Sequence, residues 1–509
     1  RGLRVLLIER FDIATGATGR NHGLLHSGAR YAVTDQESAT ECIKENMILK
    51  KIARHCVDDT SGLFITLPED DLAYQDTFVK ACLAAGINAE VIDPEEAKRM
   101  EPSVNPSLIG AVKVPDGSVD PFRLCASNVF DAKIHGAKVL VYSEVIEFIK
   151  EQDTIKGVKV LDHHTGIVTD YYAPVTVNAG GIWGHHIAQM AGANISMFPA
   201  KGALLIFAHR VNSVVINRCR KPANADILVP GDTVCVIGTT STRVPYEECD
   251  HLKVTPDEVD LLLTEGAKLA PCLAETRVLR AYAGVRPLVS ADNDPSGRNI
   301  SRGIVCLDHE TRDGIKGFIS ITGGKLMTYR LMGEMAADAV CKKLGRDAKC
   351  VTADTPLPGS EPGGIEEISK KIWEVPTMVQ KASVGRFGTQ AANLDFDGDV
   401  KGSLVCECEE VSVSEVDSAI ENLEVNNLVD LRRRTRFGMG TCQGELCACR
   451  AAGRLAKARK CTAKARADLK DFMDERWKGM YPVAWGETLR ESAYTQWVYS
   501  EVMGLGEEI

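Results

Sequence analysis

Short apolar runs that end in glycine recur along the chain, and they predict a protein of mixed helix and sheet. Residues 3–8 are a mostly apolar run that ends at Glu9. Residues 175–181 and 317–324 are two further apolar runs, and each closes on a pair of glycines. Continuous apolar runs of this length are typical of buried strands in a nucleotide-binding sheet.

The middle of the chain has a different pattern. Residues 195–310 alternate short apolar runs with turns, which predicts an antiparallel sheet interrupted by a helix at 256–270. Spacing typical of amphipathic helices predicts further helices at 36–56, around 76–86 and from 126 to Gly136. An antiparallel sheet laid over a nucleotide domain is suited to holding a substrate.

The first run has the form of the second strand of a dinucleotide-binding βαβ unit, which often ends in an acid that binds the adenosine ribose. Glu9 is the candidate for that acid. Such a unit also has a first strand and a G-x-G-x-x-G turn roughly 20 residues earlier. The sequence starts at Arg1, so we expect it to lack about 30 residues of a complete unit. The alternative is that Glu9 is an exposed charge at a strand end.

Two segments are candidates for contact with a flat or anionic ligand. Residues 11–32 are rich in glycine, threonine and alanine and contain two histidines and two arginines. So much glycine disfavours a stable helix and permits close backbone approach. At the other end, the strand 317–324 runs into a helix that is expected to start at Lys325. A helix N-terminus can hold a phosphate or a developing negative charge, although a Gly-Gly pair there is also common in ordinary turns.

The C-terminal third contains two close cysteine pairs. The first pair is Cys406-x-Cys408, and the second is Cys442 and Cys447 with four residues between them. Two such pairs can supply four thiolates to one metal centre. The spacing Cys-x-Cys is too tight for most zinc fingers, but a zinc site and free thiols remain alternatives. Cys449 is a further thiol close to the second pair.

Composition narrows the function classes. The 509 residues include 44% hydrophobic residues and a net charge of −10, which argues against a general nucleic-acid binder. No apolar run is long enough to span a membrane. Seventeen cysteines without a secretory signal favour reduced thiols and a cytoplasmic location. Residues 432–470 are strongly basic and could surround an anionic cluster, dock an acidic partner or form a solvated helix face.

The order of these motifs resembles FAD-dependent oxidoreductases of the D-amino-acid oxidase superfamily. ATGATGRNHGLLHSGARYA, NAGGIWG, GVRPL and SITGGKLMTYR are most similar to glycerol-3-phosphate dehydrogenases. The similarity is closest to the A-subunit family of anaerobic glycerol-3-phosphate dehydrogenase, which also carries a C-terminal cysteine domain. The cysteine spacing resembles bacterioferritin-associated ferredoxin-like [2Fe–2S] domains. The absent G-x-G-x-x-G is the one departure, and it bears on FAD binding by the chain.

The resemblance implies an α/β protein, α+β overall. A Rossmann-like FAD domain is expected from parts at about 1–60, 125–190 and 305–350. An antiparallel-sheet substrate domain is interleaved with it, at about 61–124 and 191–304. Together they make an oxidoreductase of residues 1–355. A linker at 356–400, a small helical [2Fe–2S] domain at 401–455 and a basic, aromatic tail at 456–509 follow.

The resemblance also implies roles for individual residues. His26 is the expected catalytic base, with His22 as its rival, and Lys325 is expected near flavin and substrate. The substrate glycerol 3-phosphate would be bound by Arg30, Tyr31, Arg286, Arg302 and Lys325. FAD would be bound by Glu9, Arg10, Thr15, Thr18, Gly19, Arg20, Val145, Ala179, Gly180, Gly323, Gly324 and Leu326. The [2Fe–2S] ligands would be Cys406, Cys408, Cys442 and Cys447.

The implied activity is oxidation of sn-glycerol 3-phosphate to dihydroxyacetone phosphate by hydride transfer to FAD. Electrons would then pass through iron–sulfur centres and partner B and C subunits to a quinone, with the complex peripheral on the inner membrane. One alternative is a flavin dehydrogenase or oxidase of another 2-hydroxy acid. Another keeps glycerol 3-phosphate but passes electrons to oxygen. A third is an inert flavin domain attached to an electron-transfer module.

Overall fold

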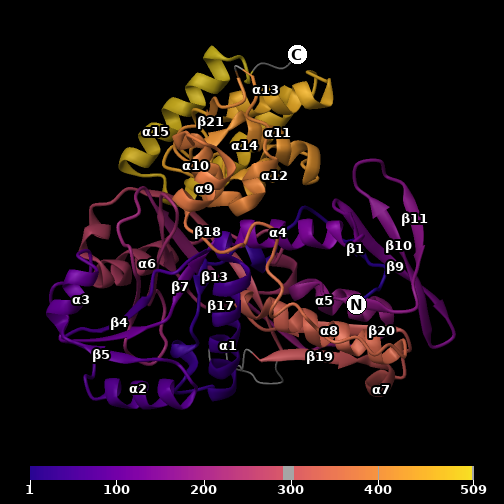
Figure 1. Cartoon of the computed structure of the whole chain (residues 1–509), viewed down its shortest axis with the longest axis horizontal. Helices are drawn as coiled ribbons and strands as arrows, with labels where there is room; N and C mark the ends of the chain where they lie inside the picture. The colour runs from indigo at the N-terminus through magenta and orange to yellow at the C-terminus, as the bar shows by residue number, and fades with distance from the viewer. Residues whose placement is uncertain (290–302, 399, 507–509) are drawn as a thin grey trace.

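The computed structural model describes residues 1–289, 303–398 and 400–506. We call residues 1–355 the body and residues 356–506 the C-terminal unit. In Figure 1 the C-terminal unit, coloured orange to yellow, lies against one side of the body, over β18 and α4. The antiparallel sheet and the nucleotide-type elements lie beside each other within the body. The expected mixed fold with a helical C-terminal domain is confirmed.

Two small sheets, one parallel and one mixed, form the nucleotide-type part. Strand β1 pairs in parallel with β8, and β12 pairs in parallel with β20, whose other edge carries β19. The apolar runs expected to be strands are therefore strands, although β1 and β12 have only three residues each. The strands are β1 (Leu6–Ile8), β8 (Lys138–Leu140), β12 (Thr176–Asn178), β19 (Ile304–Asp308) and β20 (Phe318–Gly323). The helices are α1 (Gln36–Ile52), α4 (Pro121–Ile134), α5 (Gly184–Ala191), α7 (His309–Asp313) and α8 (Tyr329–Lys343).

A nine-stranded sheet forms the substrate-type part. Its order is β17-β13-β16-β15-β14-β4-β6-β5, and the long strand β18 pairs with β13. The strands are β4 (Gly62–Thr66), β5 (Glu90–Ile92), β6 (Gly110–Val114), β13 (Met197–Phe207), β14 (Val215–Arg218), β15 (Ile227–Pro230), β16 (Cys235–Gly238), β17 (Thr242–Arg243) and β18 (Val278–Val289). Helices α2 (Tyr74–Ala84), α3 (Pro94–Met100) and α6 (Pro256–Leu269) accompany it.

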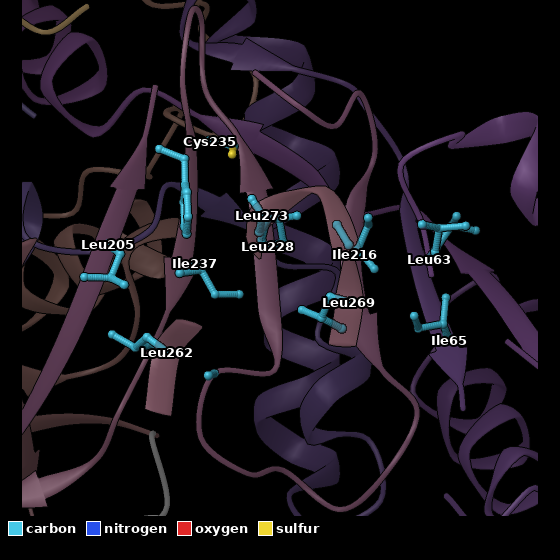
Figure 2. Packing of buried hydrophobic residues seen from close by; sticks show 14 of the residues in the cluster. Leu63, Ile65, Leu205, Ile216, Leu228, Cys235, Ile237, Leu262, Leu269 and Leu273 are labelled. Carbon is cyan, nitrogen blue, oxygen red and sulfur yellow. The ribbon is translucent and has the colours of Figure 1, made fainter. Parts of the chain in front are cut away.

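The main hydrophobic core lies between this sheet and α6. Figure 2 shows Leu205, Leu228 and Ile237 from the strands facing Leu262 and Leu269 from the helix. Helix α6 begins with a capping box, in which Thr255 and Glu258 satisfy each other's backbone N–H groups, and Pro256 occupies its first turn. The helix predicted at 256–270 is thereby confirmed and held on the sheet.

Two smaller sheets complete the body. β9 (Ser143–Glu151), β10 (Thr154–Asp162) and β11 (Val168–Tyr172) form an antiparallel extension, seen at the edge of Figure 1. The turn between β10 and β11 contains His163 and His164. β2 (Leu24–Leu25), β7 (Gly117–Val119) and β3 (Val57–Asp58) form the third sheet, which anchors the glycine-rich loop.

The structure adds detail at two of the predicted domain boundaries. The expected linker 356–400 contains α9 (Ile365–Ile372) and α10 (Met378–Phe387), which share a small apolar core. The expected tail is not separate from the cysteine domain, because Leu469, Phe472 and Tyr499 pack in that domain's own core. Its elements are β21 (Leu404–Cys406), β22 (Val411–Ser412), α11 (Val413–Asn422), α12 (Leu428–Thr435), α13 (Ala448–Arg459), α14 (Ala465–Met480) and α15 (Gly486–Trp497).

Among the described residues, no helix combines the length and the apolar character needed to cross a membrane.

Candidate active site and cysteine centre

The glycine-rich loop is pressed against its neighbours, and this fixes its path. Gly23 has φ +70°, and a Cβ there would lie 2.8 Å from the carbonyl oxygen of Val119. Gly28 has φ +95°, and a Cβ there would clash with the backbone of Ala39 in α1. Only glycine meets both demands without strain. The loop between them is therefore held in one position, and it carries His26, with His22 directly before it.

Four polar side chains from the two ends of the body come together in a line. The ring centres of His22 and His26 are 5.9 Å apart, and those of His26 and Tyr31 are 5.5 Å apart. The ammonium of Lys325 lies 4.7 Å from the centre of the Tyr31 ring. His26 is 6% exposed. The candidate base, its rival, the candidate tyrosine and the candidate lysine thus form one cluster.

The Gly-Gly turn delivers Lys325 to this cluster. Gly323 and Gly324 have φ +76° and +65°, and side chains at either position would meet close neighbours. The N–H of Lys325 donates to Oγ1 of Thr328 at 2.9 Å. A 3₁₀ turn at Leu326–Thr328 follows, and α8 begins only at Tyr329. The expected helix therefore starts later than Lys325, and the glycines serve a tight turn that aims the lysine.

The two described arginines of the predicted substrate set contact two adjoining segments of the chain. Arg30 donates to the buried carboxylate of Asp226 at 3.1 Å and to the carbonyl of Ala223 at 2.9 Å. Arg286 donates to Oγ1 of Thr239 and to the carbonyl of Thr240. The N–H of Ala225 donates a hydrogen bond of 3.2 Å to the carbonyl of Thr239, and this bond joins the two contacted segments.

The carboxylate that binds Arg30 is shared with a second arginine. Asp226 also pairs with Arg220 at 2.7 Å, and Arg220 in turn pairs with Glu265 at 3.0 Å. Arg302, the third predicted arginine, lies outside the described residues.

The predicted FAD residues next to β1 fit a cofactor. Glu9 follows β1 directly, accepts a hydrogen bond from the N–H of Phe11 at 3.0 Å, and has its pKa raised by burial. Arg10 pairs with Asp250 at 2.6 Å, and its guanidinium lies 5.2 Å from the centre of the Trp183 ring. The indole N–H of Trp183 is buried without a hydrogen-bond partner among the described residues. A buried polar group of this kind fits a site completed by a bound ligand.

The remaining predicted FAD residues fall into three groups. Thr15, Gly19 and Arg20 line a cavity of about 910 Å³, and Thr18 belongs to the same 3₁₀ turn as Gly19. Val145, a residue of β9, packs against the same hydrophobic core as Ile8 and Trp183. The third group lies at or just after the ends of the strands β12 and β20: Ala179, Gly180, Gly323, Gly324 and Leu326.

The large cavity lies where the body meets the C-terminal unit. His22 and Tyr282 line it from the body, and Cys408 and Arg432 line it from the C-terminal unit. The same cavity therefore adjoins the loop of the histidine cluster and the cysteine centre. Its size is within the range of small-molecule sites in proteins.

The four predicted cluster cysteines are neighbours. Cys406 contacts Cys447, Cys447 contacts Cys442, and Cys442 contacts Cys408 through their side chains. Contact with Cys408 and with Cys447 lowers the pKa of Cys442 to about 2. Among the residues described, no three His, Cys, Asp or Glu side chains are already spread around a metal position, but this donor set of four adjoining thiols has the chemistry of an iron–sulfur site. Cys449 is exposed on α13 and is not part of this row of contacts.

Two family models match the chain. The model of FAD dependent oxidoreductases matches residues 1–330, and that of the BFD-like [2Fe-2S] binding domain matches residues 404–455. The A-subunit of anaerobic glycerol-3-phosphate dehydrogenase from Escherichia coli is 62% identical over 509 residues, which is 100% of this chain and 94% of that protein. The protein of the same name from Haemophilus influenzae is 61% identical, over 100% of this chain and 90% of its own length.

The chain belongs to the A-subunit family of anaerobic glycerol-3-phosphate dehydrogenase. This confirms the resemblance seen in the sequence, and the two family models confirm FAD and a [2Fe–2S] cluster as the cofactors. A solved glycerol-3-phosphate dehydrogenase from Bacillus halodurans, complexed with FAD, has the same fold. Its TM-score is 0.70 at 21% identity, over 96% of this chain and 92% of that one.

Sequence reasoning missed how this member of the family joins its two parts. Arg434 forms a bidentate ion pair with Asp12, and Nη1 of Arg433 lies 2.9 Å from the same carboxylate. The basic run was expected to be a collar, a docking site or a solvated face; these two arginines instead bind Asp12 in the loop that follows β1. The run RRRTR was visible, but its partner lies 422 residues away in the chain.

Proposed function

We propose that the chain oxidises sn-glycerol 3-phosphate to dihydroxyacetone phosphate. The observation that carries this proposal is the line His22–His26–Tyr31–Lys325. It combines a buried imidazole, a hydroxyl and a cation within one site. Together these groups can bind an anionic substrate and remove a proton from its hydroxyl group.

The residues have separate tasks. Arg30 and Arg286 bind the phosphate, because guanidinium groups match phosphate oxygens. Lys325 and Tyr31 orient the substrate. A ring nitrogen of His26 accepts the proton of the substrate hydroxyl. A hydride leaves the carbon that bears this hydroxyl, so that the alcohol becomes a ketone. Bound FAD supplies the two-electron acceptor.

Glu9, the segment Thr15–Arg20, and the glycines after β12 and β20 would hold FAD. Val145 supports this region from the core. The buried carboxyl of Glu9 would bind a ribose hydroxyl. The turn at Gly323–Lys325 would place a positive side chain near the flavin edge that gains negative charge on reduction.

The four thiols of Cys406, Cys408, Cys442 and Cys447 would hold the [2Fe–2S] cluster. We further propose that electrons leave through this cluster to partner B and C subunits and then to a quinone, on a complex peripheral to the inner membrane. The relatives are named as A-subunits, which supports an assembly of several different chains. The exposed aromatic residues Trp477, Tyr481, Trp485 and Trp497 of the C-terminal unit suit burial by a partner.

The experiment is anaerobic stopped-flow spectroscopy of the purified chain mixed with glycerol 3-phosphate. We expect bleaching of the flavin absorbance by this substrate and much less by 2-hydroxyglutarate. A chain that holds flavin but prefers the 2-hydroxy acid would contradict the substrate assignment. Formation of peroxide in air at the rate of substrate oxidation would contradict the acceptor assignment.

His26→Ala tests the base. We expect flavin reduction to slow by about 10²–10⁴-fold, because the positioned proton acceptor is lost, while FAD content stays unchanged. His163→Ala, in the turn between β10 and β11, is the control and leaves both quantities unchanged. A larger loss in His22→Ala than in His26→Ala would assign the base to His22 instead.

A further inference from the structure

One face of β18 connects the proposed substrate site to the cysteine centre. Side chains alternate along a strand, so Arg280, Tyr282, Gly284 and Arg286 lie on the same face. Arg286 belongs to the predicted phosphate set. A side chain at Gly284 would clash with the carbonyl oxygen of Arg20, and the hydroxyl of Tyr282 donates to the carbonyl of Asn21 at 2.7 Å. The strand thus supports the loop that carries His22.

The same face then reaches the cysteine loop. Nη1 of Arg280 donates to Oε1 of Gln443 at 3.4 Å, and Nη2 of Arg432 donates to the same oxygen at 3.3 Å. Gln443 follows Cys442 directly, and it is 1% exposed. Its own amide donates to the carbonyls of Met439 and Gly440, both at 2.9 Å. Gln443 is therefore a fixed bridge between the body, helix α12 and the cysteine loop.

The two arginines bring charge that the described protein does not neutralise closely. The nearest carboxylate to Arg280 is that of Glu475, 4.0 Å away and partly exposed. Arg432 makes no ion pair within the described part of the chain, and its Nε has no hydrogen-bond partner there. Both side chains are more than nine-tenths buried.

Other arginines at the loop differ in this respect. Arg277 and Arg476 also donate to the cysteine loop, at the carbonyls of Thr441 and Cys442, but each pairs with Glu491 within 3.0 Å. Of these four arginines, Arg280 and Arg432 are thus the two without a carboxylate within 3.0 Å in the described part of the chain. A thiolate-bound iron–sulfur cluster carries net negative charge, which increases on reduction. Buried positive charge beside it favours the reduced form.

We propose that Arg280 is the positioning residue that couples the two redox sites. Through Gln443 it fixes the cysteine loop on the strand that carries Arg286, and together with Arg432 it raises the reduction potential of the cluster. Electrons are thereby drawn from the flavin side toward the cluster. This inference rests on the proposed function, since it presumes that the cluster receives the electrons taken from the substrate.

The test compares Arg280→Gln with the parent chain, both carrying FAD and the cluster. We expect the equilibrium constant for electron transfer from reduced flavin to cluster to fall about tenfold, which corresponds to about 59 mV for a one-electron centre. Redox titration of the cluster's EPR signal measures the potential, and stopped-flow absorbance measures the transfer rate. Reduction of the flavin by glycerol 3-phosphate keeps its rate.

Two further variants make the result specific. Arg280→Lys keeps the charge but not the planar fork, so we expect the cluster potential to be retained and the transfer to slow. Arg210→Gln removes the same charge from another arginine at the cavity, which pairs with Asp58, and leaves the cluster potential unchanged. If Arg280→Gln loses its cluster, the comparison of Arg280→Lys with the parent chain carries the test.

The inference is overturned if neither Arg280 variant changes the potential or the transfer rate. It is also overturned if Arg210→Gln shifts the potential as much as Arg280→Gln does. Failure of the proposed function gives a different result. In that case glycerol 3-phosphate does not reduce the flavin, whereas titration with dithionite still reports the effect of Arg280 on the cluster.

Discussion

The core of the nine-stranded sheet and the junction between the body and the C-terminal unit are both buried, but different forces hold them. In the core, Leu228, Ile237 and Leu262 pack in one cluster of apolar side chains (Figure 2). At the junction, Asp12 is fully buried between Arg433 and Arg434. The core gains stability from area removed from water, whereas the junction depends on each charge keeping its partner.

The difference between apolar and charged contacts affects how accurately the parts are positioned as well as how stable they are. Apolar side chains can shift slightly and still exclude water, but a two-armed ion pair has one favourable geometry. Arg436 repeats the arrangement, since it pairs with Asp120 of the body at 2.8 Å and with Glu409 of its own unit at 2.8 Å. The junction therefore fixes where the cysteine centre lies relative to the loop that follows β1.

The largest effect is expected from Asp12→Ala. The substitution leaves the buried guanidinium of Arg434 without its carboxylate and Arg433 with only Asp430 at 3.4 Å, which costs about 3–5 kcal/mol of unfolding free energy. Urea unfolding measures the loss, and hydrogen exchange should increase on both sides of the junction. Asp250→Ala removes the partly exposed partner of Arg10 and serves as control, with a loss of about 1 kcal/mol or less. Equal losses in the two variants would contradict the special role of the junction.

A smaller effect, with a defined pH window, is expected from Asp430→Asn. Burial, and then the charge of Asp12, raises the pKa of Asp430 to about 6. A carboxyl whose pKa is raised in the folded state stabilises the fold while it is protonated. This contribution is fully present below the unfolded-state pKa, near 4, and is lost as pH rises through the folded-state pKa of about 6. The parent chain should therefore lose about 3 kcal/mol more than Asp430→Asn between these pH values.

Urea midpoints of the two proteins at pH 4 and at pH 6.5 test this sign. Asp12 acts in the opposite direction, because Arg434 and Arg433 outweigh burial and lower its pKa. Its contribution is present above pH 4 and is lost on further acidification. A parent chain that gains stability relative to Asp430→Asn as pH rises from 4 to 6.5 would contradict the assignment.

The smallest effect is expected in the core itself. Ile237→Val removes one methylene from a fully buried position and should cost about 1 kcal/mol. The cluster potential and the rate of flavin reduction should remain those of the parent chain, because no junction charge changes. Thermal unfolding together with the redox titration measures both quantities. A shifted potential in this variant would mean that the core, and not the charged junction, controls the cysteine centre.

The parts predicted from sequence are those with local signals. The strands before Glu9 and after Gly317, the capped helix α6 and the two cysteine pairs are each visible within a few residues. The cluster of His26, Tyr31 and Lys325 joins two distant segments, and only the family resemblance indicated that they meet. The predicted roles of the individual site residues stay predictions, since contact alone does not establish a role.

The features that sequence did not predict are of two kinds. Some depend on contacts between distant residues, and others have a local sequence pattern that neighbouring residues obscure. Helix α9 was overlooked because a Pro/Gly-rich stretch precedes it, although Ile365, Ile368 and Ile372 have helical spacing. Asp12 contacts arginines 421 and 422 residues away, and Gln443 contacts Arg280 of the body, 163 residues away. No periodicity in the sequence encodes which carboxylate a buried guanidinium will find.

The single face of β18 has a consequence for evolution. Because side chains alternate along a strand, inserting or deleting one residue between Arg280 and Arg286 would place these two side chains on opposite faces. The strand could then no longer present Arg286 on the face that contacts the cysteine loop through Arg280. Length variation should accordingly be excluded from this strand across descendants of the chain and tolerated in the turns that border it.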